Sequence, residues 1–412
     1  MVRFLADPAR TWMAACRLTR NWRKSRGMSS GARIYADYNA TAPLRPEAKA
    51  AMTAGLGLTG NPSSVHAEGR KARALVEGAR ETVAAAIGAC RDDIAFTSGG
   101  TEAVQAPLRG VMRTLENGRI VASAIEHDAV SALCDAPQAW QVDASGVVNL
   151  TWLEAVVETL AADGVRPVVS LMLVNNETGV IQPVAAVAEI VHKAGGLIHC
   201  DAIQALGKIQ VSIINLEVDY LSLSAHKIGG PQGMGAFYVK PGAPFAAVQT
   251  GGGQEFGRRA GTENVAGIAG FAAAVTAATR GIEVYQSLAE HRDRMEEKLR
   301  AAAPSLQVHG STAARVAGVS CFGVEGLPSE TQIMALDLAG FAVSAGSACS
   351  SGKVKPSRVL TAMGLSDAAA RSAIRASFGW ATVWQDFDAL AEAWIRLAAR
   401  ARPQLVKLDT HV

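Results

Sequence analysis

The stretch SLSAHKIGG, from Ser222 to Gly230, decides the fold of this chain. It places His226 and Lys227 side by side among small and hydroxylated residues, directly after the apolar run VDYL. A lysine ammonium at the end of a buried strand costs free energy unless it is paired or takes part in chemistry. We therefore expect a strand that ends at a site where Lys227 is used.

Short apolar runs alternate with helical stretches on both sides of this segment. The helical stretches include residues 68–89 and 101–115, and the apolar runs are IAFTSG, GRIVASAI, PVVSLMLV, GLIHCDA, DYLSLSA and GAFYV. This alternation is typical of a mostly parallel sheet that is covered by helices on both faces. Ligands bind such sheets beyond the carboxyl ends of the strands. The fold class is therefore α/β, and Lys227 is expected at a ligand site.

The C-terminal part of the sequence has a different character. A charged stretch over residues 288–303 predicts a helix, and the strand-like runs GVSCFGV and FAVSAG follow it. The segment PSRVLTAM predicts a helix that Pro356 opens and Gly364 closes. A last helix is expected after Thr382, which would form a capping box with Gln385. The apolar stripe of this helix comprises Phe387, Leu390, Trp394 and Leu397.

The composition excludes several classes of protein. With 412 residues, of which 49% are hydrophobic, the chain can bury a large core in about two to three domains. The formal net charge of +3 is too small to indicate a nucleic-acid or membrane partner. The longest uncharged run, about residues 265–279, is shorter than the roughly 20 residues of a membrane-spanning helix. The six cysteines form no CxxC pair, which indicates a reduced, cytoplasmic protein without a metal site.

Residues 1–27 differ from the rest of the chain, because they carry seven basic residues and a single acid, Asp7. An arginine-rich, acid-poor start resembles an organelle transit peptide. The other interpretation is an upstream start codon, since Met28 is followed at once by SSGARIYADYNATAP. We favour the second interpretation and expect this extension to lie outside the fold.

Chemically useful side chains follow several of the predicted strands. In FTSGGTEA a strand ends in glycines and a helix opens at Thr101, which favours a phosphate, although an ordinary strand–helix turn has the same pattern. A lone aspartate such as Asp201 is more often a helix cap, and a lone histidine such as His127 is more often part of the core. Lys227 fits a Schiff-base nucleophile.

One explanation covers these residues together. Pyridoxal phosphate needs a lysine for covalent attachment, an aspartate to hold its pyridinium nitrogen protonated, a histidine against its ring and a helix N-terminus for its phosphate. Lys227, Asp201, His127 and the turn before Thr101 supply this set.

From about Ile34 to about Leu397 the chain resembles a cysteine desulfurase of the nitrogenase and iron–sulfur-cluster type, within the class V aminotransferase group. The motifs that carry this resemblance are YADYNATAP, GNPSSVHAEGRKA, FTSGGTEA, EHDAV, VNNETG, HCDAIQ, SAHKIGGPQGMGA, GGGQEFGRRAGTEN, SAGSACSSGKVKPS and RASFG. The resemblance implies a fold-type I pyridoxal-phosphate-dependent transferase. Its large domain would contain a mostly parallel sheet of the seven-stranded type, and its smaller C-terminal domain would be α+β.

The resemblance also implies roles for individual residues. Lys227 would hold the cofactor covalently, His127 would stack on its ring, and Asp201 would bond its pyridinium nitrogen. Gln204 and Asn176 would lie near the ring hydroxyl. The residues expected to hold the phosphate are Gly100, Thr101, Ser224 and His226, with Thr262 reaching over from a second subunit of a homodimer.

The resemblance also implies a role for Arg375, and the chain departs from the family pattern at Pro107. Arg375, in SAIRASFG, would bind the substrate carboxylate through its planar guanidinium fork. Pro107 departs from the small polar and aliphatic residues usual after the phosphate turn. We expect Pro107 to remove one helical hydrogen bond and to kink that helix.

The stretch SAGSACSSGKVKPS distinguishes this chain from a general transaminase. By composition alone it predicts a flexible surface loop with an incidental thiol. Serines and glycines nevertheless surround Cys349, and an exposed thiol is a liability unless it is used. The long serine-rich loop resembles that of the subgroup whose cysteine moves between the active site and an acceptor protein.

The sequence therefore predicts an enzyme that converts L-cysteine to L-alanine and leaves a persulfide on Cys349. Its partners would be a second copy of the chain and a sulfur-acceptor or iron–sulfur scaffold protein, whose identity the sequence does not give. A selenocysteine lyase or a small-molecule transaminase of the same group, and a non-catalytic assembly scaffold, are the alternatives.

The expected domain organisation follows from these assignments. Residues 1–27 form the extension, and residues 28–45 pack with the small domain. Residues 46–280 form the large cofactor-binding domain. Residues 281–412 form the small domain, which carries the loop with the catalytic cysteine.

Overall fold

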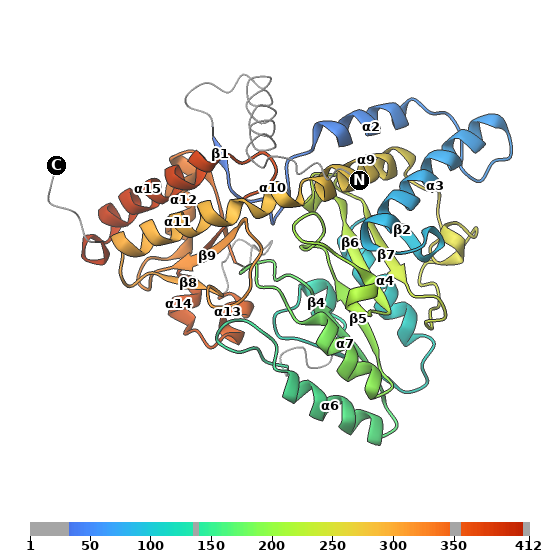
Figure 1. Ribbon diagram of the computed structural model, residues 1–412, viewed down its shortest axis with the longest axis horizontal. Helices are drawn as coiled ribbons and strands as arrows, with labels where there is room; N and C mark the ends of the chain where they lie inside the picture. The colour runs from blue at the N-terminus through green and yellow to red at the C-terminus, as the bar shows by residue number, and fades with distance from the viewer. Residues whose placement is uncertain (1–32, 135–139, 347–355, 407–412) are drawn as a thin grey trace, which may run out of the picture.

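The computed structural model describes residues 33–134, 140–346 and 356–406 (Figure 1). The expectations for the N-terminal extension, and the catalytic cysteine Cys349, therefore lie outside the described residues.

A six-stranded sheet forms the centre of the larger half of the molecule. Its order is β2 (Ile94–Thr97), β7 (Gly235–Val239), β6 (Tyr220–Ser224), β5 (Leu197–Asp201), β4 (Arg166–Met172) and β3 (Gly118–Ala122). Strand β7 is antiparallel to both of its neighbours, and β3 to β6 are parallel. The expected mostly parallel sheet is confirmed. It has six strands in the described part of the chain rather than seven, and an isolated parallel bridge between Ser123 and Trp140 follows β3.

Helices cover both faces of this sheet. The two faces are separate hydrophobic clusters, and neighbouring residues of β4 alternate between them, with Val168 in one cluster and Val169 in the other. One face is covered by α4 (Gly100–Met112) and α5 (Asp128–Ser131). The other is covered by α3 (Ala67–Ile87), α6 (Leu150–Ala162), α7 (Val184–Lys193) and α9 (Val265–Arg280), and α2 (Pro46–Leu56) packs on α9.

Helix α3 illustrates how the local sequence sets these elements. His66 caps its N-terminus, since the ring Nδ1 accepts a hydrogen bond from the Gly69 N–H. Gly88 ends the helix at φ +73°, a left-handed conformation that glycine adopts without a Cβ clash. The buried stripe between these ends includes Ala72, Val76, Ala79, Val83 and Ile87.

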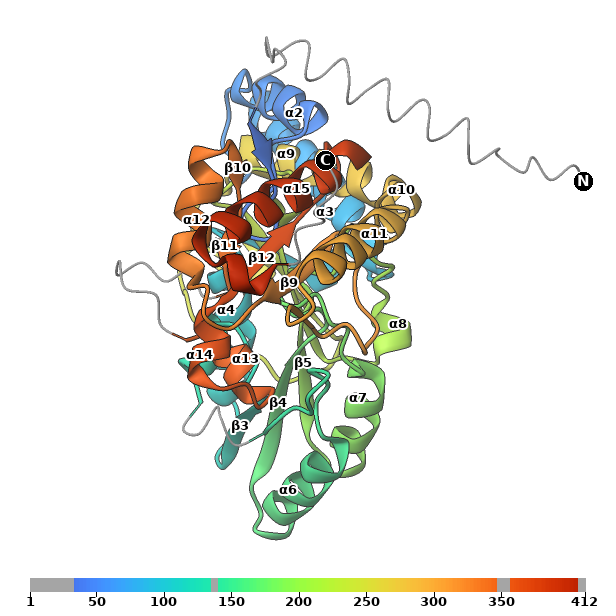
Figure 2. The same ribbon diagram turned by 90° about the vertical axis from the view of Figure 1, so that its left-hand side faces the viewer.

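A four-stranded antiparallel sheet forms the smaller half. Its order is β11 (Ser344–Ala345), β12 (Ala373–Ser377), β9 (Val319–Gly323) and β8 (Gln307–His309). The helices around it are α10 (Ile282–Gln286), α11 (Leu288–Ala302), α12 (Ser329–Leu338) and α15 (Trp384–Ala401). Figure 2 shows α12, α15 and β12 in front of the larger sheet. The core includes an edge-to-face contact of Phe322 with Trp394, whose indole N–H donates to Gln332 Oε1 at 2.7 Å.

The N-terminal segment joins the smaller half, because β1 (Ile34–Tyr35) pairs in parallel with β10 (Phe341–Ala342). We propose the domain boundary near Gly281, between α9 and α10, and assign β1 to the small domain. The two separate sheets and the β1–β10 pair support this division. Short elements complete the described chain: α8 (Ile213–Leu216), α13 (Arg358–Ala362), α14 (Asp367–Arg371) and the 3₁₀ turns η1 (Arg91–Asp93), η2 (Ala225–Lys227), η3 (Glu255–Gly257) and η4 (Pro403–Leu405).

Two expected helix starts were wrong by one or two residues. Helix α15 begins one residue later than expected, because Thr382 Oγ1 accepts from the Gly379 N–H instead of capping the helix. The cap is the carboxylate of Asp386, which accepts from the Val383 N–H at 3.0 Å. Helix α13 is capped by Ser357, whose Oγ accepts from the Leu360 N–H, so the expected opening residue Pro356 lies outside it.

Among the described helices, no single one is long and apolar enough to cross a membrane. One bent pair, Val265–Arg280 with Ile282–Ala302, is long and apolar enough when its two parts are taken together, and the parts meet at an angle of 61°.

Candidate active site

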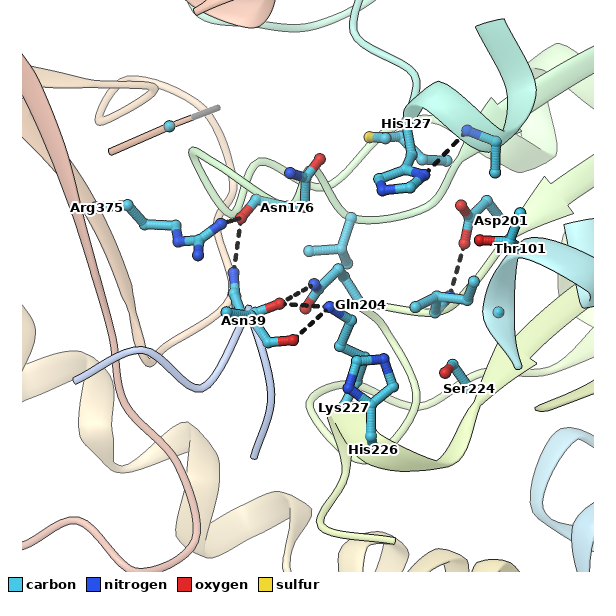
Figure 3. Close-up of a pocket in the computed structure, with 17 residues that line it drawn as sticks. Asn39, Thr101, His127, Asn176, Asp201, Gln204, Ser224, His226, Lys227 and Arg375 are labelled. Atoms are coloured by element: carbon cyan, nitrogen blue, oxygen red, sulfur yellow. Dashed lines mark hydrogen bonds between the residues drawn. The ribbon is translucent and has the colours of Figure 1, made fainter. Parts of the chain in front are cut away.

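A cavity of about 380 Å³ lies beyond the carboxyl ends of β5 and β6, where the two halves of the molecule meet (Figure 3). It is lined by ten of the residues that the sequence predicts for the site: Gly100, Thr101, His127, Asn176, Asp201, Gln204, Ser224, His226, Lys227 and Arg375. The predicted residue Thr262 is exposed and does not line this cavity. The structure thus brings together residues that are up to 275 positions apart, from Gly100 to Arg375.

One end of the cavity is suited to an anion. Helix α4 begins there, after the N-cap residue Gly99. No side chain of the described residues accepts a hydrogen bond from the first N–H groups of this helix. These N–H groups and the positive end of the helix dipole therefore face the cavity. The buried Oγ of Ser224 has no hydrogen-bond partner in the described chain. A Cβ on Gly100 would lie 2.8 Å from Ile203 Cδ1 and 3.2 Å from Ser224 Cβ, so a larger residue here would have to displace both neighbours. These donors and this space fit a phosphate group.

His226 lies at the same end. Its Nδ1 is 3.2 Å from Thr41 Oγ1, and burial together with the charge of Lys227 lowers its pKa to about 4. The ring is therefore neutral near pH 7, so it can bond to a phosphate oxygen without contributing a full charge.

Lys227 lies at the centre of the cavity, in the turn that follows β6. Its Nζ donates to the backbone carbonyls of Asn39 at 2.7 Å and Ala40 at 2.9 Å. Burial, and then the charge of Arg375, lowers its pKa to about 8, against the opposing effect of two aspartates. The amine is therefore partly neutral close to pH 7, which is the state that attacks a carbonyl.

Asp201 ends β5 and lines the cavity beside Thr101 (Figure 3). One of its oxygens accepts from the Ile203 N–H at 2.9 Å. Burial raises the pKa of this carboxyl, while the charges of His127 and Lys227 oppose the rise. A buried carboxylate of this kind gains from a protonated ring nitrogen beside it.

His127 caps the short helix α5, since its Nδ1 accepts from the Ala129 N–H at 3.1 Å. In the neutral ring the proton therefore lies on Nε2. The residue is exposed and lines the cavity, so the alternative interpretation of a core histidine is wrong.

Arg375 reaches the cavity from β12 of the smaller sheet. Its Nη2 donates to Asp37 Oδ1 at 2.7 Å and its Nη1 donates to the Asn176 carbonyl at 3.0 Å. Its buried Nε has no hydrogen-bond partner among the residues described. The guanidinium therefore has donors left for a carboxylate at this end of the cavity.

Several residues around the cavity were not predicted from the sequence. Asn39 and Ala40 hold Lys227 through backbone carbonyls, which a side-chain pattern does not reveal. Asp37 pairs with Arg375 across 338 positions. Asn39 lies within the motif YADYNATAP and Lys208 lies four residues beyond HCDAIQ, but the side-chain pattern assigned a role to neither.

The comparisons with known proteins agree with this geometry. The aminotransferase class-V family matches the chain over residues 34–390. The chain belongs to this family. Its resemblance to the cysteine desulfurases of the family, expected from the motifs, is confirmed by curated relatives of that name. One from Cereibacter sphaeroides is 41% identical over 371 residues, which are 87% of this chain and 94% of the relative. Another from Klebsiella pneumoniae is 38% identical and covers 86% of this chain and 90% of the relative.

Solved structures of the family share the same fold. A NifS-like protein from Rickettsia africae has a TM-score of 0.80 at 31% identity, and the match covers 89% of this chain and 99% of the other. A second NifS-like protein has a TM-score of 0.81 at 32% identity, with 89% and 100% of the two chains covered. The chain therefore has the fold of the NifS-type cysteine desulfurases, and the enzymes of this family depend on pyridoxal phosphate.

Proposed function

We propose that this chain is a pyridoxal-phosphate-dependent cysteine desulfurase that converts L-cysteine to L-alanine and forms a persulfide on Cys349. The observation that carries this proposal is the placement of Lys227. Its amine, with a pKa of about 8, lines the same cavity as Asp201 and the residues suited to an anion. A solved relative that is 29% identical, SspA, is described in complex with cysteine, which supports cysteine as the substrate.

The cavity residues fit the cofactor. The N-terminal turn of α4 at Gly100 and Thr101, the unpartnered Ser224 Oγ and the neutral His226 would hold its phosphate. Asp201 would hold its ring nitrogen, and Lys227 would be its point of attachment. His127 would lie against its ring, with Asn176 and Gln204 near its hydroxyl group. When bound, pyridoxal phosphate supplies an electron sink for the bond cleavages at the substrate.

The side chains of this chain then have separate tasks. Arg375 binds the substrate carboxylate through the donors that Asp37 and Asn176 leave available. Lys227, once released by substrate, takes the α-proton, for which its lowered pKa is suited. The Cys349 thiolate forms a bond to the substrate sulfur as the carbon–sulfur bond breaks. The carbon fragment takes up one proton at Cβ, regains at Cα the proton that Lys227 removed, and leaves as alanine.

The proposed assembly is a homodimer in which Thr262 contributes to the phosphate site of the neighbouring subunit. The exposure of Thr262, away from the cavity of its own chain, supports this role. A sulfur-acceptor or iron–sulfur scaffold protein would receive the sulfur from Cys349. We place the enzyme in the cytoplasm, which the scattered cysteine spacing supports.

The test replaces Cys349 by serine. A serine hydroxyl is a much poorer nucleophile at sulfur than a thiolate, so the variant should bind cofactor and cysteine but release little alanine. After incubation with cysteine, mass spectrometry of the unchanged protein should find one added sulfur on the peptide that contains Cys349. Serine replacements of Cys16, Cys90, Cys134, Cys200 and Cys321 are the controls and should leave alanine release in place.

Other outcomes would favour the alternatives. Full alanine release by Cys349→Ser, or a persulfide on a different cysteine, would contradict the proposal and favour a lyase or transaminase of the same family. A purified protein that remains colourless after incubation with the cofactor would favour an assembly scaffold.

A further inference from the structure

A second lysine, Lys208, lies beside the cavity without lining it. It is buried, with 5% of its surface exposed, and it follows Gln204 by four residues. Its Nζ donates to Gln204 Oε1 at 2.6 Å and to Asn39 Oδ1 at 2.7 Å. Both acceptors are uncharged amide oxygens, and no carboxylate of the described chain forms an ion pair with this amine.

These contacts fit a neutral amine. A neutral lysine has two N–H groups, and the two amide oxygens use both of them, whereas an ammonium would have a third N–H to satisfy in a buried position. Burial, with the positive charges of Lys227 and Arg375, also places the pKa of Lys208 well below its ordinary value.

The amine fixes the orientation of both amides, because it donates only to their oxygen ends. The Nδ2 of Asn39 then faces the Asn176 carbonyl, to which it donates at 2.9 Å. The Nε2 of Gln204 faces the Asn39 carbonyl, to which it donates at 2.9 Å. If either amide turned over, an oxygen would meet a carbonyl oxygen, which is repulsive.

The same two carbonyls bind the catalytic cations. The Asn39 carbonyl also accepts from Lys227 Nζ, and the Asn176 carbonyl also accepts from Arg375 Nη1 (Figure 3). Lys208 is thus connected, through the side chains of Gln204 and Asn39, to the two backbone carbonyls that also accept from Lys227 and Arg375.

We infer that Lys208 is a positioning residue. As a neutral amine it holds Gln204 so that the cavity receives an N–H donor from this side chain and no acceptor. On the proposed function, on which this inference rests, that donor suits the anionic ring oxygen of the cofactor. Lys208 acts through Gln204 and Asn39 and does not touch the cofactor or the substrate.

The test is the variant Lys208→Met, which keeps the length of the side chain and loses both N–H donors. Its readout is the visible absorption spectrum of the bound cofactor as a function of pH. We expect the midpoint of this titration to move by about one pH unit or more, since one donor to the ring oxygen is lost or misdirected. The kcat for cysteine should fall about tenfold, with a smaller change in KM.

Two further variants separate positioning from folding. In the background Gln204→Ala, adding Lys208→Met should shift the midpoint of the titration by much less than in the unchanged protein, because Gln204 is absent and only the contact of Lys208 with Asn39 is left to lose. The control Lys298→Met removes a surface lysine that pairs with Glu392 on α15, and it should leave the spectrum unchanged.

The outcomes are distinguishable. If Lys208→Met lowers thermal stability but leaves the spectrum and its titration unchanged, Lys208 is structural and the inference is wrong. An additive shift in the Gln204→Ala background would also overturn it. If the unchanged protein itself binds no cofactor, the proposed function has failed rather than the role of Lys208.

Discussion

Ser222 Oγ donates a hydrogen bond at 2.7 Å to the carbonyl of Ala103, inside helix α4. This carbonyl is the one that the residue four positions later would bond in a regular helix, and that residue is Pro107, which has no N–H. The sheet therefore supplies the donor that the proline lacks. The expected loss of one helical hydrogen bond is real, yet α4 runs from Gly100 to Met112 with Pro107 inside it.

We predict that Ser222 and Pro107 are coupled in stability. Ser222→Ala should lower the free energy of unfolding by about 1–3 kcal/mol, because a buried carbonyl loses its donor. In the background Pro107→Ala the same change should cost less, since the restored N–H satisfies Ala103. Urea denaturation of the four proteins measures this coupling. His199, whose Nε2 lies 2.7 Å from Ser222 Oγ, loses the same partner in both backgrounds, so its contribution cancels. Equal costs in the two backgrounds would contradict the compensation.

A second prediction concerns Glu126, the buried residue before His127. Burial, and then the charge of Asp201, raises its pKa from 4.5 to about 8, and its Oε2 has no partner in the described chain. The folded protein therefore holds this proton up to a higher pH than the unfolded chain does. Stability from this group is complete below pH 4.5 and is lost as pH rises towards about 8.

The variant Glu126→Gln should lack this loss. Relative to the unchanged protein, its free energy of unfolding should rise between pH 5 and pH 8.5, by roughly 1.4 kcal/mol per unit of pKa shift. The exposed Glu158, replaced by glutamine, is the control on α6 and should show no such change. Parallel stability curves for the Glu126 variant and the unchanged protein would show that Glu126 is ionised in the fold.

The sequence predicts the sheet and the cavity side chains because both leave local patterns. The strands of the large sheet are short apolar runs; Asp201 and Ser224 end two of them, and Lys227 lies in the turn after the second. Contacts made through the backbone leave no such pattern. The Asn39 and Ala40 carbonyls reach Lys227 because long-range contacts hold the N-terminal segment here, among them the β1–β10 pair and the hydrogen bond from the Asn39 N–H to Ser377 Oγ.

The same limit explains the errors in detail. The predicted cap of α15 was wrong because Thr382 Oγ1 accepts from the N–H of Gly379 and not from an N–H of the helix. Both donors are close in sequence, and packing decides which of them Thr382 binds. The compensation of Pro107 depends on Ser222, which is 119 positions from the Ala103 carbonyl. Sequence periodicity carries no information about a pair so far apart.

The ion pair between Asp37 and Arg375 leads to a third prediction. Arg375 is 4% exposed, so Asp37→Asn would leave a buried guanidinium without this carboxylate and should destabilise the ligand-free protein. A ligand carboxylate should then replace the lost charge. We expect L-alanine to raise the melting temperature of Asp37→Asn more than that of the unchanged protein.

Two comparisons check this interpretation. Arg375→Ala should abolish the effect of L-alanine in either background, since the guanidinium is the proposed carboxylate site. A weaker response of Asp37→Asn to L-alanine than that of the unchanged protein would mean that Asp37 aligns the guanidinium and does not compete for it.

The last prediction separates the catalytic role of Lys227 from the stability that the protein loses by burying its ammonium group. Its pKa is about 8 in the folded protein and 10.5 ordinarily, so between these values the unfolded chain binds more protons than the folded one. The stability of the unchanged protein should therefore rise with pH across this window, as the buried ammonium loses its proton. The variant Lys227→Met has no such group, so it should lack this contribution, while the buried Lys208 remains in both proteins.

The free energy of unfolding of Lys227→Met minus that of the unchanged protein should thus be several kcal/mol larger at pH 7 than at pH 10.5. The expected size is about 1.4 kcal/mol per unit of pKa shift. The loss of donors to the Asn39 and Ala40 carbonyls affects the variant equally at both pH values, so it does not change this difference. Chemical denaturation of the cofactor-free proteins measures it, with the surface variant Lys298→Met as the control. The same Lys227 variant should show no visible absorption from attached cofactor and release no alanine, because only an amine can form that link. A pH-independent difference in stability, with activity lost, would show that Lys227 is catalytic but carries no burial cost.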